Sequence, residues 1–138
     1  RDFYQGAYFT ALEPGEILTS VSVPVPPASH GYAYEKLKRK VGDYATAAAA
    51  VVLTMEGGRA ATCTIALTNL SETPLLAEEA AQAVIGTGLD DAALKQAAEA
   101  AKAIMEPAGD GRGPAEYRTH VGGIMVGRAL KRAAARAG

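Results

Sequence analysis

The chain has 138 residues, 49% of them hydrophobic and 21% charged, which suits one globular domain and excludes a mainly disordered chain. Fourteen Lys and Arg against fifteen Asp and Glu leave a formal net charge of -1, so no overall field attracts nucleic acid or an anionic membrane. A single cysteine excludes an internal disulfide, and no apolar run approaches the roughly 20 residues of a transmembrane segment.

Short segments rich in β-branched residues predict that strands come first in the chain. The Pro14-Gly15 pair predicts a tight turn. Residues 17–23 follow it with Ile, Thr and Val at alternate positions, and this alternation predicts a strand that Pro24 stops. The chain begins with Arg1 in place of an initiator Met, so we expect it to continue upstream in a longer parent.

Three more strands are expected before residue 73. Residues 32–41 predict a partly exposed strand, because lysines alternate there with other side chains. Residues 44–55 and 59–70 flank Gly57-Gly58, and paired glycines supply the positive φ angles that hairpin turns require. The sequence therefore predicts a β-hairpin at this point.

Alanine dominates from residue 73 onward and predicts helices. Thr73 can cap a first helix over residues 75–85, with Pro74 at its first position. A second helix is expected from Asp90 or Asp91 to Met105, before a proline that forbids further propagation.

A third helix is expected to begin at Pro114, with an acidic first turn and basic last turns that suit the helix dipole. Its expected inward side chains are Tyr117, Val121, Ile124 and Leu130. The economical fold is α+β: an antiparallel sheet of about three to four strands, followed by about three helices packed on one face.

The usual signatures of catalysis are weak in this sequence. His30, His120 and Cys63 lie far apart and lack the spacing of a metal site, so we expect no metal ligand and no catalytic residue. Cys63 is expected to be a small buried hydrophobe. The glycine-rich residues 109–113 resemble a phosphate loop only loosely, and a loop that positions the last helix is the favoured interpretation.

The densest polar cluster covers residues 35–44. One interpretation is a solvated edge strand whose lysines prevent edge pairing, and the residues alone favour it. The other is a loop that presents the ring of Tyr44 and nearby cations to a flat or anionic ligand.

Three segments in the same order resemble the medium, flavin-carrying subunits of the xanthine oxidase family, above all those of aerobic molybdenum-copper carbon monoxide dehydrogenases. They are residues 10–18 (TALEPGEIL), 34–45 (YEKLKRKVGDYA) and 110–118 (DGRGPAEYR). The resemblance spans nearly the whole chain and implies a sheet packed on helices, in agreement with the periodicity. It implies that residues 1–138 are a single C-terminal domain, with the FAD-binding lobe lying upstream and absent from this chain.

The resemblance also implies that, in the complete complex, CO is oxidised at a molybdenum-copper pterin centre of a large subunit. Electrons then pass through two [2Fe-2S] clusters of a small iron-sulfur subunit to FAD, and onward to a quinone-type acceptor. The expected partners are the upstream FAD-binding lobe, the large molybdoprotein subunit and the small subunit. The expected location is the cytoplasm, including the inner face of the membrane.

For the site, the resemblance implies that this domain adds only a segment beside the isoalloxazine ring, because the Gly-rich FAD loops of the family find no match here. Tyr44 is the expected ring contact and Asp43 shapes its loop, while Lys36 or Lys38 supplies nearby positive charge. The alternatives are the medium subunit of a related aldehyde, nicotinate or xanthine-type hydroxylase, and a non-enzymatic module whose helices dock a partner.

Overall fold

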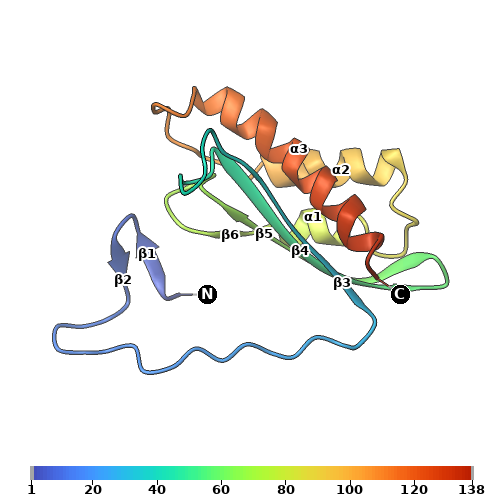
Figure 1. Cartoon of the computed structure of the whole chain (residues 1–138), viewed down its shortest axis with the longest axis horizontal. Helices are drawn as coiled ribbons and strands as arrows, with labels where there is room; N and C mark the ends of the chain where they lie inside the picture. The colour runs from blue at the N-terminus through green and yellow to red at the C-terminus, as the bar shows by residue number, and fades with distance from the viewer. Residues whose placement is uncertain (1, 138) are drawn as a thin grey trace.

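A four-stranded antiparallel sheet in the order β3-β4-β5-β6 forms the body of the computed structural model, which describes residues 2–137. The strands are β3 (His30–Leu37), β4 (Ala47–Glu56), β5 (Arg59–Thr68) and β6 (Leu75–Leu76). Three helices follow and cover one face of the sheet (Figure 1): α1 (Glu78–Gln82), α2 (Asp91–Lys102) and α3 (Ala115–Ala134). The expected α+β fold, with a sheet followed by helices on one face, is confirmed.

The long hairpin of β4 and β5 turns at Gly57 and Gly58, whose φ angles are 55° and 77°. Both angles are positive, as the sequence predicted for this turn. Ala49 and Val51 face the helices from β4, opposite Leu67 and Ile65 of β5. The small alanines at the start of β4 leave room for α3 to pack closely on the sheet.

The strand predicted over residues 17–23 does not form. The turn at Pro14-Gly15 is present, but the chain after it runs extended and exposed until β3 (Figure 1). A strand needs a neighbour to accept its hydrogen bonds, and no strand pairs with this segment within residues 2–137. A short hairpin of β1 (Tyr4–Gly6) and β2 (Phe9–Thr10), which was not predicted, precedes it.

The strand predicted over residues 32–41 is shorter at its end than expected. It begins at His30 and ends at Leu37, so Lys38 lies just outside it. The polypeptide then turns through Gly42, which has a φ angle of +83°. The alternation of lysines continues beyond Leu37, the last residue of β3. The sequence pattern therefore placed the end of the strand too far along the chain.

The first predicted helix is also corrected. Residues 75–76 pair with β5 as strand β6, and α1 covers only Glu78–Gln82. Thr73 therefore does not cap it, since the N-cap residue is Ala77. The apolar Leu75 sits opposite Leu67 in the sheet, and this pairing outweighs the helix propensity of the segment.

The other two helices lie close to their predicted positions. Asp90 caps α2 by accepting a hydrogen bond from the Ala93 N–H at 2.9 Å, and Pro114 is the N-cap residue of α3. Of the four side chains expected to face inward from α3, Val121 and Leu130 are buried. The other two were predicted wrongly, since Tyr117 and Ile124 are 46% and 40% exposed.

The core lies between the sheet and the helices. Its largest fully buried side chains are Leu53, Ile65, Leu67, Leu70, Leu130, Val51, Val84 and Val126. Within the described residues, no helix is long and apolar enough to cross a membrane.

Candidate functional site

The β3–β4 loop, residues 38–46, carries the aromatic side chain that the sequence singled out. The Thr46 N–H donates to the Leu37 carbonyl at 2.7 Å and closes the base of the loop. The Asp43 N–H donates to the Lys40 carbonyl at 3.3 Å and forms a turn within it. Tyr44 follows this turn and is 74% exposed, so its ring is available to a partner.

Arg112 reaches the loop from the segment before α3. Its Cζ lies 5.8 Å from the centroid of the Tyr44 ring, within the usual range of a cation–π contact. One terminal nitrogen pairs with Asp110 at 2.8 Å, and the other lies 3.9 Å from the Asp43 carboxylate. The Arg112 backbone N–H also donates to Asp110 at 2.8 Å, and this bond, followed by the guanidinium groups, lowers the pKa of Asp110 below its usual value.

A second arginine holds the backbone that follows Tyr44. Arg118 of α3 is only 5% exposed, and its Nε donates to the Thr46 carbonyl at 3.1 Å. Its two terminal nitrogens donate to the carbonyls of Ala108 and Asn69. The Asn69 side chain in turn donates to the Ala45 carbonyl at 2.9 Å. Buried arginine is costly unless its donors are used, and here they tie the loop to the helical layer.

A hollow of about 690 Å³ opens beside the loop. Two tyrosines, three carboxylates and two arginines are among the residues that line it: Tyr8, Tyr44, Glu72, Glu106, Asp110, Arg112 and Arg118. Three carboxylates against two arginines leave a small net negative charge, which does not favour phosphate. The backbone N–H of Arg112, which a phosphate loop would offer to its ligand, is already taken by Asp110.

The two candidate lysines lie apart from this cluster of contacts. Lys36 is on the exposed face of β3, and its Nζ is 5.9 Å from the ring centroid of Tyr34. Lys38 is half-buried at the start of the β3–β4 loop. The cation that lies over the Tyr44 ring is Arg112. The structure thus brings Tyr44 and Asp43 together and adds Arg112, which the sequence did not single out as a site residue.

Sequence reasoning missed both arginines for a simple reason. Arg112 and Arg118 belong to the string of residues 110–118, which contributed to the family resemblance, but nothing in its local pattern tells which distant loop it meets. Thr46 and Arg118 are 72 residues apart in the chain. Their contact depends on how α3 crosses the sheet.

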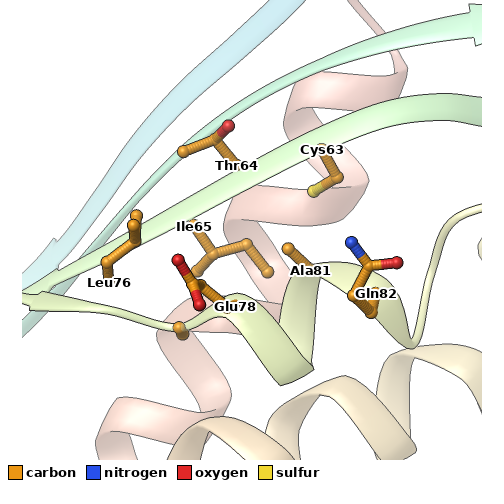
Figure 2. A pocket seen from close by; sticks show the side chains of 8 residues that line it. Cys63, Thr64, Ile65, Leu76, Glu78, Ala81 and Gln82 are labelled. Carbon is orange, nitrogen blue, oxygen red and sulfur yellow. The ribbon is translucent and has the colours of Figure 1, made fainter.

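A different hollow, of about 310 Å³, lies between β5 and α1 and is lined in part by Cys63, Thr64, Glu78 and Gln82 (Figure 2). Burial raises the pKa of the Cys63 thiol to about 11, so the sulfur is protonated at neutral pH. A protonated thiol is a weak nucleophile. Cys63 is half-buried, so it is not the fully buried side chain that the sequence predicted. Among residues 2–137, no group of three or more His, Cys, Asp or Glu side chains is arranged to hold a metal ion.

A family model, curated relatives and a solved structure all match this chain to CO dehydrogenase flavoproteins. The model of the CO dehydrogenase flavoprotein C-terminal domain matches residues 32–133. The carbon monoxide dehydrogenase medium chain of Afipia carboxidovorans is 66% identical over 137 residues, and that of Hydrogenophaga pseudoflava is 46% identical over 134. The solved structure of reconstituted CO dehydrogenase from Oligotropha carboxidovorans matches with a TM-score of 0.97 and 65% identity.

The matches to the relatives cover nearly all of this chain but only part of each relative. They span 99% of this chain and 48% of the Afipia medium chain, and the solved structure likewise matches over 99% of this chain and 48% of its own. The chain therefore spans about half the length of the relatives it matches. The match of residues 32–133, together with the high identity and the shared fold, shows that the chain belongs to the CO dehydrogenase flavoprotein C-terminal domain family.

Proposed function

We propose that the chain is the C-terminal domain of the FAD-carrying medium subunit of a molybdenum-containing carbon monoxide dehydrogenase. The upstream half would hold most of the FAD, and this domain would close one side of the flavin. The observation that supports this role most directly is an exposed Tyr44 ring on a loop whose backbone is tied to the body by Arg118 and Asn69. A rigidly mounted aromatic ring suits contact with a flat heterocycle.

The residues present fit a flavin contact but not a complete flavin site. An isoalloxazine ring can stack on Tyr44, and Asp43 maintains the turn before it through its backbone bond to Lys40. Three carboxylates outnumber the two arginines that line the hollow, so it does not favour the diphosphate of FAD, and this supports an anchor in the upstream lobe. When bound, the flavin supplies the electron-transfer chemistry, while this domain fixes the position and solvent access of its ring.

We further propose that Lys36 and Lys38 contribute positive charge at longer range. Lys36 lies near the end of β3 and Lys38 at the start of the β3–β4 loop, and a cation near a flavin favours its reduced, anionic forms. Their effect is expected to be small and salt-dependent, because solvent and ions screen the charge of exposed Lys36 and, to a lesser degree, that of half-buried Lys38.

At the level of the complex, electrons would come from CO oxidised at a molybdenum-copper pterin centre of a large subunit. They would pass through [2Fe-2S] clusters of a small subunit to the FAD and then to an external acceptor. The two relatives named carbon monoxide dehydrogenase medium chain, from different organisms, support this assignment of substrate.

The test uses the intact parent chain co-expressed with its large and small subunits. We expect a complex with flavin absorbance that reduces an artificial acceptor when CO is supplied. Reduction with an aldehyde, nicotinate or xanthine but not with CO would assign the chain to a related hydroxylase. A colourless medium chain that binds no FAD in the complex would contradict the flavoprotein role altogether.

The site itself is tested by Tyr44→Ala, with Tyr34→Ala as a matched control because Tyr34 is also an exposed tyrosine, on β3. Loss of one aromatic contact is expected to weaken FAD retention by about twofold to tenfold, since such pairs contribute about 0.5–1.5 kcal/mol. The control is expected to retain FAD as the unmodified subunit does. Equal flavin content, absorbance and potential in the two variants would remove Tyr44 from the site.

A further inference from the structure

We propose that Arg112 is a positioning residue for the flavin contact, and that it also balances the charge of the carboxylates beside Tyr44. This inference rests on the proposed function, in which the ring of Tyr44 meets the isoalloxazine. Arg112 would have two separable effects: it orients the Tyr44 ring, and it sets the charge beside the flavin.

The orienting effect follows from the contacts of the guanidinium group. Arg112 lies over the Tyr44 ring with its Cζ 5.8 Å from the centroid, while its two terminal nitrogens point to Asp110 and Asp43 at 2.8 and 3.9 Å. Asp43 directly precedes Tyr44, so one planar group contacts both the ring and the adjacent residue of the loop. The planar guanidinium of arginine can lie over the Tyr44 ring and point a nitrogen to Asp43 at the same time. The compact ammonium of lysine cannot do both in one fixed geometry.

The position of Arg112 is itself fixed from several sides. Its backbone N–H and its side chain both donate to Asp110 at 2.8 Å, and Arg118 lies 3.5 Å from the same carboxylate. The Nε of Arg112 is buried and has no hydrogen-bond partner within residues 2–137, so the group is held by its terminal nitrogens. Buried Arg118 therefore holds Asp110, and Asp110 holds Arg112. Arg112 in turn contacts the exposed Tyr44 ring.

The charge effect follows from the balance of this cluster. Two arginines and two aspartates, Arg112, Arg118, Asp43 and Asp110, cancel in net charge. Removing the charge of Arg112 leaves this cluster with one excess negative charge next to Tyr44, and Glu72 and Glu106 also line the adjacent hollow. The cations at residues 38–40 lie earlier in the same loop and remain in every variant. Negative charge disfavours the reduced, anionic flavin, so the midpoint potential is expected to fall.

The experiment compares Arg112→Gln and Arg112→Lys in the intact medium chain, assembled with its large and small subunits. The matched control is Arg136→Gln, because Arg136 lies over another exposed tyrosine, with its Cζ 5.0 Å from the Tyr32 ring centroid. Three quantities are measured: the FAD dissociation constant, flavin fluorescence, which a stacked tyrosine quenches, and the flavin midpoint potential. Circular dichroism confirms that each variant is folded.

Arg112→Gln is expected to weaken FAD binding by about twofold to fivefold, as loss of an exposed cation–π contact implies, and to raise the fluorescence and lower the potential. Arg112→Lys keeps the charge and loses the planar fork, so it restores the potential but not the quenching. Arg136→Gln leaves all three quantities unchanged. If Arg112→Gln behaves like this control, or if Arg112→Lys restores the quenching in full, the positioning role is overturned.

A double variant separates this inference from the proposed function. In a Tyr44→Leu background, Arg112→Gln is expected to cause no further rise in fluorescence, because the ring through which it acts is gone. An equal rise in both backgrounds would show that Arg112 acts independently of Tyr44 and would overturn the inference alone. If Tyr44→Leu by itself leaves the flavin signals unchanged, the proposed ring contact fails, and the positioning role with it.

Discussion

Arg118 is the residue on which the local architecture of the site depends most. It is a charged side chain buried to 5% exposure and satisfied by the backbone carbonyls of Thr46, Ala108 and Asn69. Those carbonyls belong to three separate connections, so a single guanidinium fixes the β3–β4 loop relative to two others. Such support from the layer behind the loop suits its proposed role in contacting a flavin.

Replacing Arg118 by Met is therefore expected to destabilise the fold by roughly 2–5 kcal/mol, because buried carbonyls lose their donors. Arg118→Lys is expected to recover only part of this loss, since one ammonium cannot reach three carbonyls set apart in space. Urea unfolding followed by circular dichroism measures both. An Arg118→Met variant as stable as the parent would show that the three bonds contribute nothing net.

The Cys63 thiol gives a prediction about reactivity. Its pKa rises from an ordinary 9.0 to about 11 because burial disfavours the thiolate. The thiolate fraction at pH 8 is then much smaller, while a more basic thiolate is intrinsically more reactive, so alkylation of the native protein is expected to slow by roughly tenfold or more relative to the unfolded chain. Iodoacetamide labelling with and without urea provides the comparison, and equal rates would contradict the burial.

At the scale of elements, the packing of α3 on β3 depends on a glycine. A Cβ added at Gly31 would lie 1.9 Å from the Ala133 carbonyl oxygen and 2.8 Å from the Ala137 nitrogen. Both are backbone atoms, which cannot swing aside as the end of a flexible side chain can. The close approach of helix and strand at this point therefore requires glycine.

Gly31→Ala is expected to cost roughly 1–3 kcal/mol of unfolding free energy, the usual penalty for overpacking, or more if α3 cannot shift. Gly127→Ala on α3 is the control, because its added Cβ meets nothing within 4 Å and alanine favours a helix. Thermal unfolding of the two variants should shift in opposite directions. A Gly31→Ala variant as stable as the control would contradict the close contact.

The sequence predicted correctly those features that depend only on residues close together in the chain. The paired glycines of the β4–β5 hairpin, the Asp90 cap of α2 and the proline at the start of α3 each act within a few residues, and all three predictions hold. The strand predicted over residues 17–23 is wrong, and the helix predicted over residues 75–85 forms only at Glu78–Gln82, because the state of both segments depends on partners. The first segment has strand periodicity without a neighbouring strand in residues 2–137, and the second pairs with β5 at its start.

For the molecule as a whole, the order of elements and the family could be predicted from the sequence, whereas the composition of the site could be predicted only in part. Tyr44 and Asp43 lie on the expected loop, where Tyr44 lines a surface hollow and Asp43 lies 3.9 Å from Arg112. The cation beside the ring is Arg112, from a segment far along the chain, and neither proposed lysine contacts that ring among the described side chains. The packing of α3 and the segment before it on the sheet decides which cation lies beside the Tyr44 ring, and no local sequence pattern encodes that packing.

The most direct test is a structure of the intact, FAD-loaded medium chain within its complex. We expect the Tyr44 ring to be offset-stacked on the isoalloxazine, with centroids within about 4.5–7 Å, and Arg112 to lie on the side of the tyrosine away from the flavin. A flavin bound against another surface of this domain, with Tyr44 facing solvent, would contradict it.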